Sequence, residues 1–393
     1  FNGGPGGSSL AGFFKEHGPY LITESSGLTY NEYSWNQYAN VLYLESPLGT
    51  GFSQISEENY SPDDETATDN FYFALLDFMT RVHPNYSQRG YYLSGQSYAG
   101  ASVPWLTRRL LQGITSGEMK NENFKGFALG NPVFTDSANT IGQALVYLIN
   151  GAIPQNYTEV LFEAWKSVLR GEGLDRAEKD IEFLSLIESV QEYYNGSILY
   201  NMVDHCPLPE MGETNKYHRQ EKGQSYSCYA TSALEAYLGR IDVQTSLHVN
   251  QRFEVPMKWE SQNFPLYYRY NQTHNTFPIY NDMIRLLNGK SFRMLVYHGD
   301  TDGILPVISS VQSTIKIAAD NNLTVQEYTP VWHFFGDYAG ARTGYRDRNV
   351  TLDMLTVRGA GHSVPMSLPD YSFQMIHNFI FTEESEIDYS KPI

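Results

Sequence analysis

Short apolar runs alternate with helical stretches along most of this chain. The expected strands cover residues 41–45, 90–94, 124–129, 293–298 and 354–357. Apolar residues at helical spacing follow most of these strands, over residues 69–82, 103–111 and 370–381. Because parallel strands are joined by long crossovers, usually helices, this alternation predicts an α/β fold with a mostly parallel central sheet.

The charge balance excludes one large class of partners. The 393 residues include 27 Lys and Arg against 44 Asp and Glu, which gives a formal net charge of −17. Nucleic acids are bound through clustered basic side chains, and the sequence contains no basic run. No apolar run approaches the roughly 18 residues that a membrane helix needs. We therefore expect a globular protein that binds no nucleic acid and spans no membrane.

The character of the sequence changes between residues 151 and 289. Residues 157–169 and 174–194 have the pattern of two polar-faced helices, and an irregular stretch rich in Tyr and Asn follows them. We interpret 151–289 as a largely helical cap, inserted into a core made of residues 1–150 and 290–393.

Glycosylation sequons indicate the secretory pathway. The Asn-x-Ser/Thr sequons begin at Asn59, Asn85, Asn156, Asn195, Asn271, Asn322 and Asn349. The only cysteines are Cys206 and Cys228, which in an oxidising compartment would most simply form a disulfide with each other. Unused sequons and a pair of free buried thiols are the alternatives. We expect a secreted or vacuolar glycoprotein, which the pI of about 5.0 suits.

A serine lies at a tight turn between an expected strand and an expected helix. The stretch is Tyr91-Tyr92-Leu93-Ser94-Gly95-Gln96-Ser97-Tyr98-Ala99-Gly100. Small residues on both sides of Ser97 are typical of a nucleophile elbow, although Ala99 replaces the usual second glycine. An ordinary strand-to-helix turn is the alternative interpretation of this motif alone.

Acidic and basic partners for Ser97 follow two later strands. Asp300 and Asp302 come after the strand at 293–298, and His362 comes after the strand at 354–357. Ser, Asp, His is the order of the α/β-hydrolase triad, in which the imidazole takes the proton of the serine and the carboxylate orients the imidazole. Either aspartate could serve as the triad acid.

The chain begins with a glycine-rich loop, Asn2-Gly3-Gly4-Pro5-Gly6-Gly7-Ser8-Ser9. This loop lacks the Gly-Lys-Ser/Thr ending of a phosphate-binding loop. Backbone N–H groups without side chains around them suit an oxyanion, so we interpret the loop as part of an oxyanion hole rather than as a flexible linker.

In combination these motifs resemble the serine carboxypeptidases of the α/β-hydrolase fold, over nearly the whole chain except the cap. The matching stretches are Asn2-Gly3-Gly4-Pro5-Gly6, Ser8-Ser9-Leu10, Phe14-Lys15-Glu16-His17-Gly18-Pro19, Asn40-Val41-Leu42-Tyr43-Leu44, Gly51-Phe52-Ser53, Ser97-Tyr98-Ala99-Gly100, Gly130-Asn131, Gly299-Asp300-Thr301-Asp302, Gly359-Ala360-Gly361-His362 and Val364-Pro365.

The resemblance implies a role for each matching residue. It implies Ser97 as nucleophile, Asp302 as triad acid and His362 as base. The implied oxyanion hole consists of the N–H groups of Gly4 and Tyr98. The carboxylate of the substrate would be bound by Asn2, the N–H of Gly3, Glu16 and Gln96. No metal or other cofactor is implied.

Five positions depart from the family pattern. Gln96 stands where the family usually has a Glu that pairs with the position of Glu16. Gly7 replaces a common disulfide cysteine, Ser363 a common Met, and Ala101-Ser102 a His and an aromatic residue. The triad and the oxyanion loop are retained, so these departures bear on substrate recognition.

The resemblance also concerns the start of the chain. The implied fold places a strand directly before the glycine loop, between the strands expected at 41–45 and 90–94, and only its last residue, Phe1, is in this sequence. We therefore expect the N-terminal strands to be missing here, and these strands and a signal peptide to precede Phe1 in the complete protein.

The expected function is that of a serine carboxypeptidase that releases amino acids from peptide or protein C-termini. Gln96 keeps open an acyltransferase, an esterase or a lyase that uses the same triad, and a catalytically silent homologue is a further alternative. The sequence indicates neither the preferred side chain at the cleaved bond nor the oligomeric state.

Overall fold

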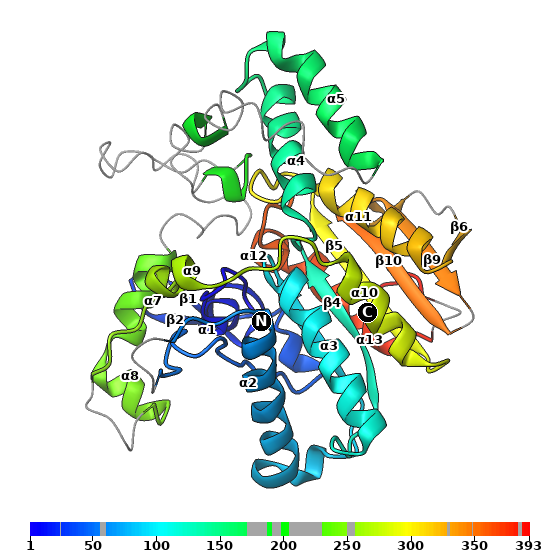
Figure 1. Cartoon of the computed structure of the whole chain (residues 1–393). Helices are drawn as coiled ribbons and strands as arrows, with labels where there is room; N and C mark the ends of the chain where they lie inside the picture. The colour runs from blue at the N-terminus through cyan, green and yellow to red at the C-terminus, as the bar shows by residue number, and fades with distance from the viewer. Residues whose placement is uncertain are drawn as a thin grey trace.

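The computed structural model describes residues 1–23, 25–55, 60–170, 187–190, 198–203, 230–249, 256–327, 331–347, 349–383 and 387–393 (Figure 1). Its main sheet contains six strands in the order β3-β4-β5-β10-β9-β6. Their bounds are Tyr91–Gln96 (β3), Phe124–Gly130 (β4), Phe292–Gly299 (β5), Val350–Val357 (β10), Arg342–Asp347 (β9) and Thr324–Glu327 (β6). Two small hairpins pair β1 (Tyr20–Ile22) with β2 (Leu28–Tyr30) and β7 (Trp332–Phe334) with β8 (Asp337–Gly340).

The four neighbouring strands β3, β4, β5 and β10 run parallel, and β9 runs antiparallel to both of its neighbours. Each of these four strands was expected from its apolar run, and each is confirmed. Every residue of β5 is buried, because both faces of a sheet with helices on both sides are covered. The prediction of a mostly parallel sheet is therefore correct.

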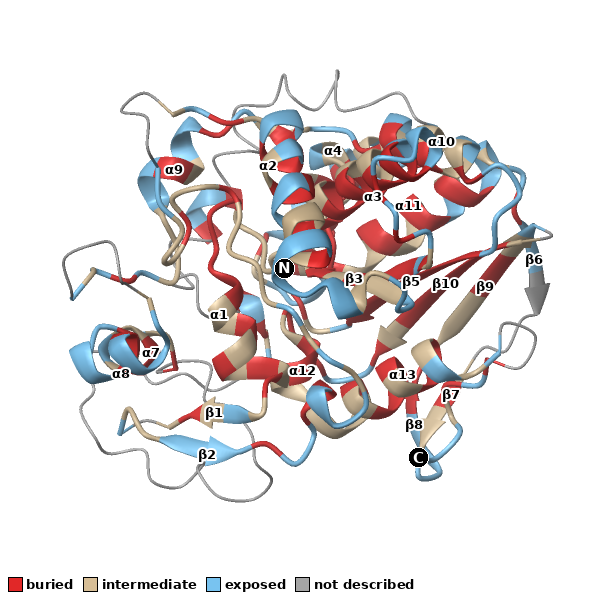
Figure 2. Cartoon of the chain, turned by 90° about the horizontal axis from the view of Figure 1, so that it is seen from below, coloured by how far each residue is buried: buried red, intermediate tan, exposed pale blue. Residues whose placement is uncertain are grey.

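Helices cover both faces of this sheet, as Figure 2 shows. On one face lie α2 (Asp64–Asp77), α3 (Ala99–Ser116), α10 (Phe277–Leu287) and α11 (Val307–Asp320), and on the other lies α13 (Pro369–Phe381). Alternate residues of β5 enter the two cores: Met294 packs with the first group of helices and Leu295 with α13. This alternation follows from the two-residue period of a strand.

The structure describes further α-helices besides these five. They are α1 (Ser9–Gly12), α4 (Asp136–Ile149), α5 (Thr158–Leu169), α7 (Ala230–Leu238), α8 (Ile241–Ser246), α9 (Phe264–Arg269) and α12 (Val364–Ser367). The helix expected at 157–169 is confirmed as α5, which packs on α4 through Leu161 and Tyr147. Most of the helix expected at 174–194 falls outside the described residues. The division into core and cap stays a prediction.

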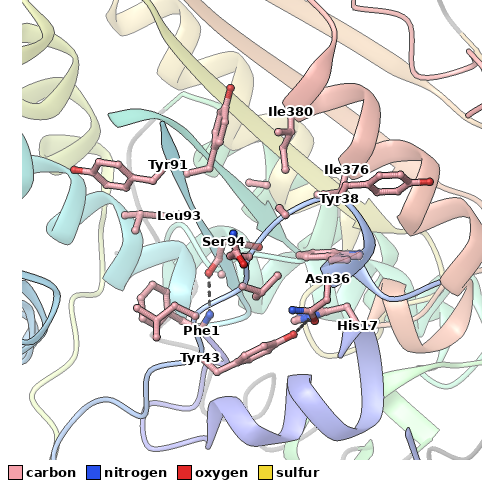
Figure 3. A pocket seen from close by; sticks show the side chains of 18 of the residues that line it. Phe1, His17, Asn36, Tyr38, Tyr43, Tyr91, Leu93, Ser94, Ile376 and Ile380 are labelled. Atoms are coloured by element: carbon pink, nitrogen blue, oxygen red, sulfur yellow. Dashed lines mark hydrogen bonds between the residues drawn. The ribbon is translucent and has the colours of Figure 1, made fainter. Parts of the chain in front are cut away.

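The prediction of a strand at residues 41–45 is wrong. This segment has no strand pairing, and side chains satisfy part of its backbone, since the hydroxyl of Ser9 donates to the carbonyl of Leu44 (2.6 Å) and that of Ser53 to Glu45 (2.7 Å). A groove of about 900 Å³ separates it from β3 (Figure 3). An apolar run becomes a strand only where a neighbouring strand lies within hydrogen-bonding distance.

Phe1 lies at one end of this groove and continues the sheet by one residue. Its amino group donates to the carbonyl of Ser94 (2.8 Å; Figure 3), and its carbonyl accepts from the N–H of Gln96 (3.0 Å). These two bonds place Phe1 opposite Gly95 in a parallel register. The glycine loop that follows is thereby fixed beside the end of β3.

Candidate active site

Ser97 occupies a strained turn between β3 and α3. Its φ of +63° is a left-handed conformation that non-glycine residues rarely adopt. The turn is closed by small residues, because a Cβ on Gly95 would lie 2.6 Å from the Cβ of Ala99, and one on Gly100 2.3 Å from the carbonyl of Val133. The turn therefore accommodates Ala99 but requires glycine at positions 95 and 100. The structure thus has the geometry of a nucleophile elbow.

The imidazole of His362 is paired with Asp302. The distance from Nδ1 of His362 to Oδ2 of Asp302 is 2.6 Å, and both side chains are buried. Because a carboxylate only accepts hydrogen bonds, this contact places the proton on Nδ1 and leaves Nε2 as the proton acceptor. Asp300 is exposed and accepts instead from the N–H of Gly359 (2.7 Å). Of the two candidates, the fold brings only Asp302 to the histidine.

The glycine loop lies directly against the elbow. A Cβ built on Gly3 would stand 2.4 Å from the backbone nitrogen of Tyr98 and 2.6 Å from the Cβ of Ser97. Only glycine allows this approach, which brings the loop to the two residues that follow β3. The N–H of Gly7 donates back to the carbonyl of Gly3 (2.9 Å) and closes the loop.

The four residues expected to bind the substrate carboxylate are also brought together. Glu16, on the short π-helix η1 (Phe13–His17), is buried, and it accepts a hydrogen bond from the amide of Asn2 (3.2 Å). The amide of Gln96 lies 2.6 Å from the hydroxyl of Ser363. With its nitrogen turned toward Glu16, the same amide donates to Oε2 of Glu16 at 2.7 Å and still accepts from Ser363. This orientation is preferred, since otherwise two acceptor oxygens would face each other.

Known proteins similar to this chain share one family. The family model described as "Serine carboxypeptidase" matches residues 1–382. The chain belongs to the serine carboxypeptidase family. Serine carboxypeptidase ctsa-4.1 of Caenorhabditis elegans is 31% identical over 416 residues, covering 100% of this chain and 84% of the relative. Serine carboxypeptidase-like 36 of Arabidopsis thaliana is 32% identical over 387 residues, covering 97% of this chain and 75% of the relative.

A solved structure shows the same fold. The crystal structure of Kex1(delta)p, a prohormone-processing carboxypeptidase from Saccharomyces cerevisiae, superimposes with a TM-score of 0.73 at 18% identity. The match covers 96% of this chain and 81% of the other. The expected α/β-hydrolase fold is confirmed. No helix among the described residues of this serine carboxypeptidase is long and apolar enough to cross a bilayer.

Asn131 is a site residue that the sequence analysis named only as part of a motif. It follows β4 with a φ of +44° and is fully buried. Its amide donates to Oδ2 of Asp302 (2.7 Å) and to the carbonyl of Gly361 (3.3 Å), and its Oδ1 accepts from the N–H of Gly299 (3.2 Å). Asn131 therefore holds together the loop of the aspartate and the loop of the histidine. Its place directly after a buried strand was the available signal.

His298, in β5, is a second buried polar residue beside the triad. Its Nε2–H donates to the carbonyl of Leu305, so its Nδ1 accepts from the hydroxyl of Ser310 (2.8 Å). Burial lowers the pKa of His298 to about 4. The neutral imidazole thus ties the two ends of the Asp302 loop together. The sequence offered no signal for this role.

A described residue of the predicted cap covers the histidine. The carbonyl of Tyr200 accepts from the N–H of His362 (2.6 Å), and the two rings meet edge to face at 5.2 Å. Among the described side chains, Ser97 and His362 form no hydrogen bond, a contact that is often long in free enzymes. The serine and histidine loops are nonetheless adjacent, since the side chain of Gln96 accepts a hydrogen bond from the hydroxyl of Ser363 (2.6 Å), the residue after His362.

Burial affects the chemistry of Glu16. It raises the pKa of Glu16 above its ordinary value, because an ionised carboxylate loses the stabilisation of water there. Lys15, the hydrogen bond from Asn2, and His362 oppose this effect. Glu16 therefore keeps its proton to a higher pH than an exposed glutamate would.

The remaining predicted residues differ in exposure. Asn85, Asn156, Asn271 and Asn322 are exposed. Asn349 is half-buried, and its amide donates to the carbonyl of Gly289 (2.7 Å). Asn59, Asn195, Cys206 and Cys228 lie outside the described residues. The groove of about 900 Å³ is lined by Asn2 and Gln96 but not by Ser97, Asp302 or His362.

Proposed function

We propose that this serine carboxypeptidase hydrolyses the last peptide bond of a chain through an acyl-enzyme on Ser97. The observation that carries this proposal is the cluster of Asn2, Glu16 and Gln96 next to the serine. A protease that cleaves within chains needs no group for a free carboxylate, whereas an exopeptidase must bind one at a fixed distance from its nucleophile.

In the first step, the hydroxyl of Ser97 attacks the carbonyl carbon of the scissile bond while Nε2 of His362 takes its proton. Asp302 holds the imidazole in the required tautomer and stabilises its charged form. The N–H groups of Gly4 and Tyr98 would donate to the oxyanion that develops. His362 then protonates the leaving amino group, and water hydrolyses the ester on Ser97 by the same route in reverse.

The substrate carboxylate would be held by neutral donors. The amides of Asn2 and Gln96 and the N–H of Gly3 can each donate a hydrogen bond. When Glu16 is protonated, it can donate as well, and its raised pKa extends the pH range in which it does so. Released amino acids carry the same carboxylate and should inhibit weakly.

One comparison of substrates tests this function. The protein is mixed with a blocked dipeptide with a free carboxylate, with the same dipeptide as its C-terminal amide, and with a simple ester. We expect a higher kcat/KM for the dipeptide with the free carboxylate than for its C-terminal amide. Cleavage of the ester alone would favour another acyl chemistry, and cleavage of none of the three would indicate a silent homologue.

We further propose that the protein is a secreted or vacuolar glycoprotein with a disulfide between Cys206 and Cys228. The four exposed sequon asparagines support glycosylation, since an oligosaccharide needs a surface position. Mass spectrometry of the protein from a secretory host tests both claims. Endoglycosidase should lower the mass, and alkylation without reduction should modify neither cysteine.

A further inference from the structure

Asp64 is a buried carboxylate with no role in the chemistry described so far. It is the first residue of α2 and is 3% exposed. Its two oxygens accept hydrogen bonds from the phenol of Tyr98 (2.7 Å), the phenol of Tyr270 (3.0 Å) and the N–H of Thr273 (2.8 Å). All three donors are neutral. Burying a carboxylate is costly, and three hydrogen bonds offset that cost only while every donor stays in place.

One of these donors belongs to the oxyanion hole. Tyr98 follows Ser97 directly, and its backbone N–H is the proposed donor to the oxyanion. Its side chain is 6% exposed and meets the ring of Tyr270 edge to face at 5.9 Å. Because the phenol and the N–H belong to the same residue, fixing the phenol restricts how the peptide plane of Tyr98 can rotate.

Two of the three partners of Asp64, Tyr270 and Thr273, lie on a segment that also holds the glycine loop. We call residues 261–273 the clamp segment; it includes α9, and Figure 1 shows the chain running on from α9 across the molecule to α10. At its start, the amide of Gln262 donates to the carbonyl of Pro5 (2.8 Å), and the N–H of Asn263 donates to the carbonyl of Gly6 (3.0 Å).

The other end of the clamp segment is tied to the helices that flank the elbow. The N–H of Asn271 donates to the carbonyl of Pro62, just before α2 (2.9 Å). The hydroxyl of Thr273 accepts from the indole of Trp105 in α3 (3.2 Å). One continuous segment therefore contacts the two sides of the oxyanion hole, at the glycine loop and at Tyr98.

We propose that Asp64 is a positioning residue for the oxyanion hole. By binding the phenol of Tyr98 to the clamp segment, it sets the separation between the N–H groups of Tyr98 and Gly4. The inference rests on the proposed function, in that it concerns the same hole. Loss of one oxyanion donor costs about 10²–10³ in kcat, so a displaced donor should cost about tenfold.

The test compares Tyr98→Phe and Asp64→Asn with a matched control, Tyr389→Phe. The hydroxyl of Tyr389 also donates to a buried aspartate, Asp353 (2.9 Å), but both residues lie in the core beside α13. All three changes remove or weaken a buried hydrogen bond to a carboxylate. Only the first two should affect the oxyanion hole.

Two measurements separate positioning from folding. The first is kcat on a simple ester, which needs the oxyanion hole whatever its leaving group. The second is inhibition by a blocked dipeptide aldehyde, in which Oγ of Ser97 adds to the aldehyde carbon, the proton passes to His362 and the aldehyde oxygen becomes the oxyanion. Inhibition by the released amino acid serves as the reference, because it does not use the hole.

We expect Tyr98→Phe and Asp64→Asn each to lower kcat and aldehyde affinity by about tenfold, with amino-acid inhibition unchanged, and the double variant to be no worse than Tyr98→Phe. Losses no larger than those of Tyr389→Phe, or equal losses for the aldehyde and the amino acid, would overturn the proposal. If Asp64→Asn does not fold, the result for Tyr98→Phe alone decides whether the proposal holds. If the wild type hydrolyses the ester but no peptide, the proposed carboxypeptidase function is refuted. The role of Asp64 can still be tested in that case, because both measurements use the oxyanion hole and neither needs cleavage of a peptide.

Discussion

The imidazole of His362 donates to the carboxylate of Asp302, whereas Asp300 turns its carboxylate to the N–H of Gly359. The two aspartates are separated by one residue and follow the same strand. Asp302 also accepts from the N–H groups of Ile304 (2.8 Å) and Leu305 (3.1 Å). These two bonds hold Oδ1 of Asp302 toward its own loop, so that Oδ2 is directed at His362.

This difference predicts unequal effects of two similar substitutions. Asp302→Asn should lower kcat on a blocked dipeptide by about a thousandfold or more, because the amide favours the wrong imidazole tautomer. Asp300→Asn should change kcat by less than about threefold, since its carboxylate only closes a surface loop. Melting temperatures show whether either variant is misfolded. Equal losses of kcat in two folded variants would refute the assignment.

The elbow predicts a single reactive serine. An organophosphorus reagent should label the protein at Ser97 alone, because among the described serines only Ser97 lies on the elbow next to the proposed oxyanion loop. Ser97→Ala should lower kcat by at least about a thousandfold, to the residual rate that binding and the oxyanion hole provide. Peptide mapping of the labelled protein is the measurement, and label on another serine would contradict the proposed triad.

Gln96 predicts a weak pH dependence of peptide binding. In Gln96→Glu, a carboxyl at 96 beside Glu16 would raise one pKa, so that a shared proton is available at acid pH. As the pH rises that proton is lost, and two negative groups face a negative substrate. In the wild type only Glu16 ionises, and the amide donates at any pH.

We therefore expect KM for a free-carboxylate dipeptide to rise more steeply above about pH 6 in Gln96→Glu than in the wild type. The amidated dipeptide is the control, because it has no carboxylate to repel, and its hydrolysis should be nearly unchanged. Superimposable profiles of KM against pH for the two proteins would mean that Gln96 does not contact the substrate.

His298 predicts a loss of stability in acid. Its pKa is lowered to about 4 in the folded protein, against about 6.5 when unfolded. Between these values only the unfolded chain binds the proton, so the free energy of unfolding should fall by up to about 3 kcal/mol as the pH falls from about 6.5 to about 4. Chemical denaturation across this range measures the slope.

The variant for this test is His298→Gln, which cannot be protonated. It should be less stable than the wild type at pH 7, because the bonds to Leu305 and Ser310 are weakened, but its profile should be flatter in acid. His83→Gln removes an exposed histidine and should leave the slope unchanged. An equally steep slope in His298→Gln would show that another group causes the loss.

The predicted strands β3, β4, β5 and β10 are all present, because an apolar run flanked by helical patterns is a local signal that burial on both faces reinforces. The run at 41–45 carries the same signal and forms no strand. A strand requires hydrogen bonds to a neighbour, and on the side of the groove the described residue that pairs with β3 is Phe1. Local patterns report the tendency to form a strand but not the presence of its partner.

The residues proposed to carry the chemistry were identifiable from sequence alone. A serine at a glycine-flanked turn, a carboxylate and a histidine each follow a strand, and the ends of parallel strands meet. The residues that hold these groups in place were not identifiable from the sequence. Asn131, His298, Tyr200 and Asp64 act through contacts with residues up to 230 positions away in the chain, as between Asn131 and Gly361. Only packing of the strands, and of residues 199–203 and 261–273 on them, decides which polar groups come within hydrogen-bonding distance, because that distance depends on the whole fold and not on spacing.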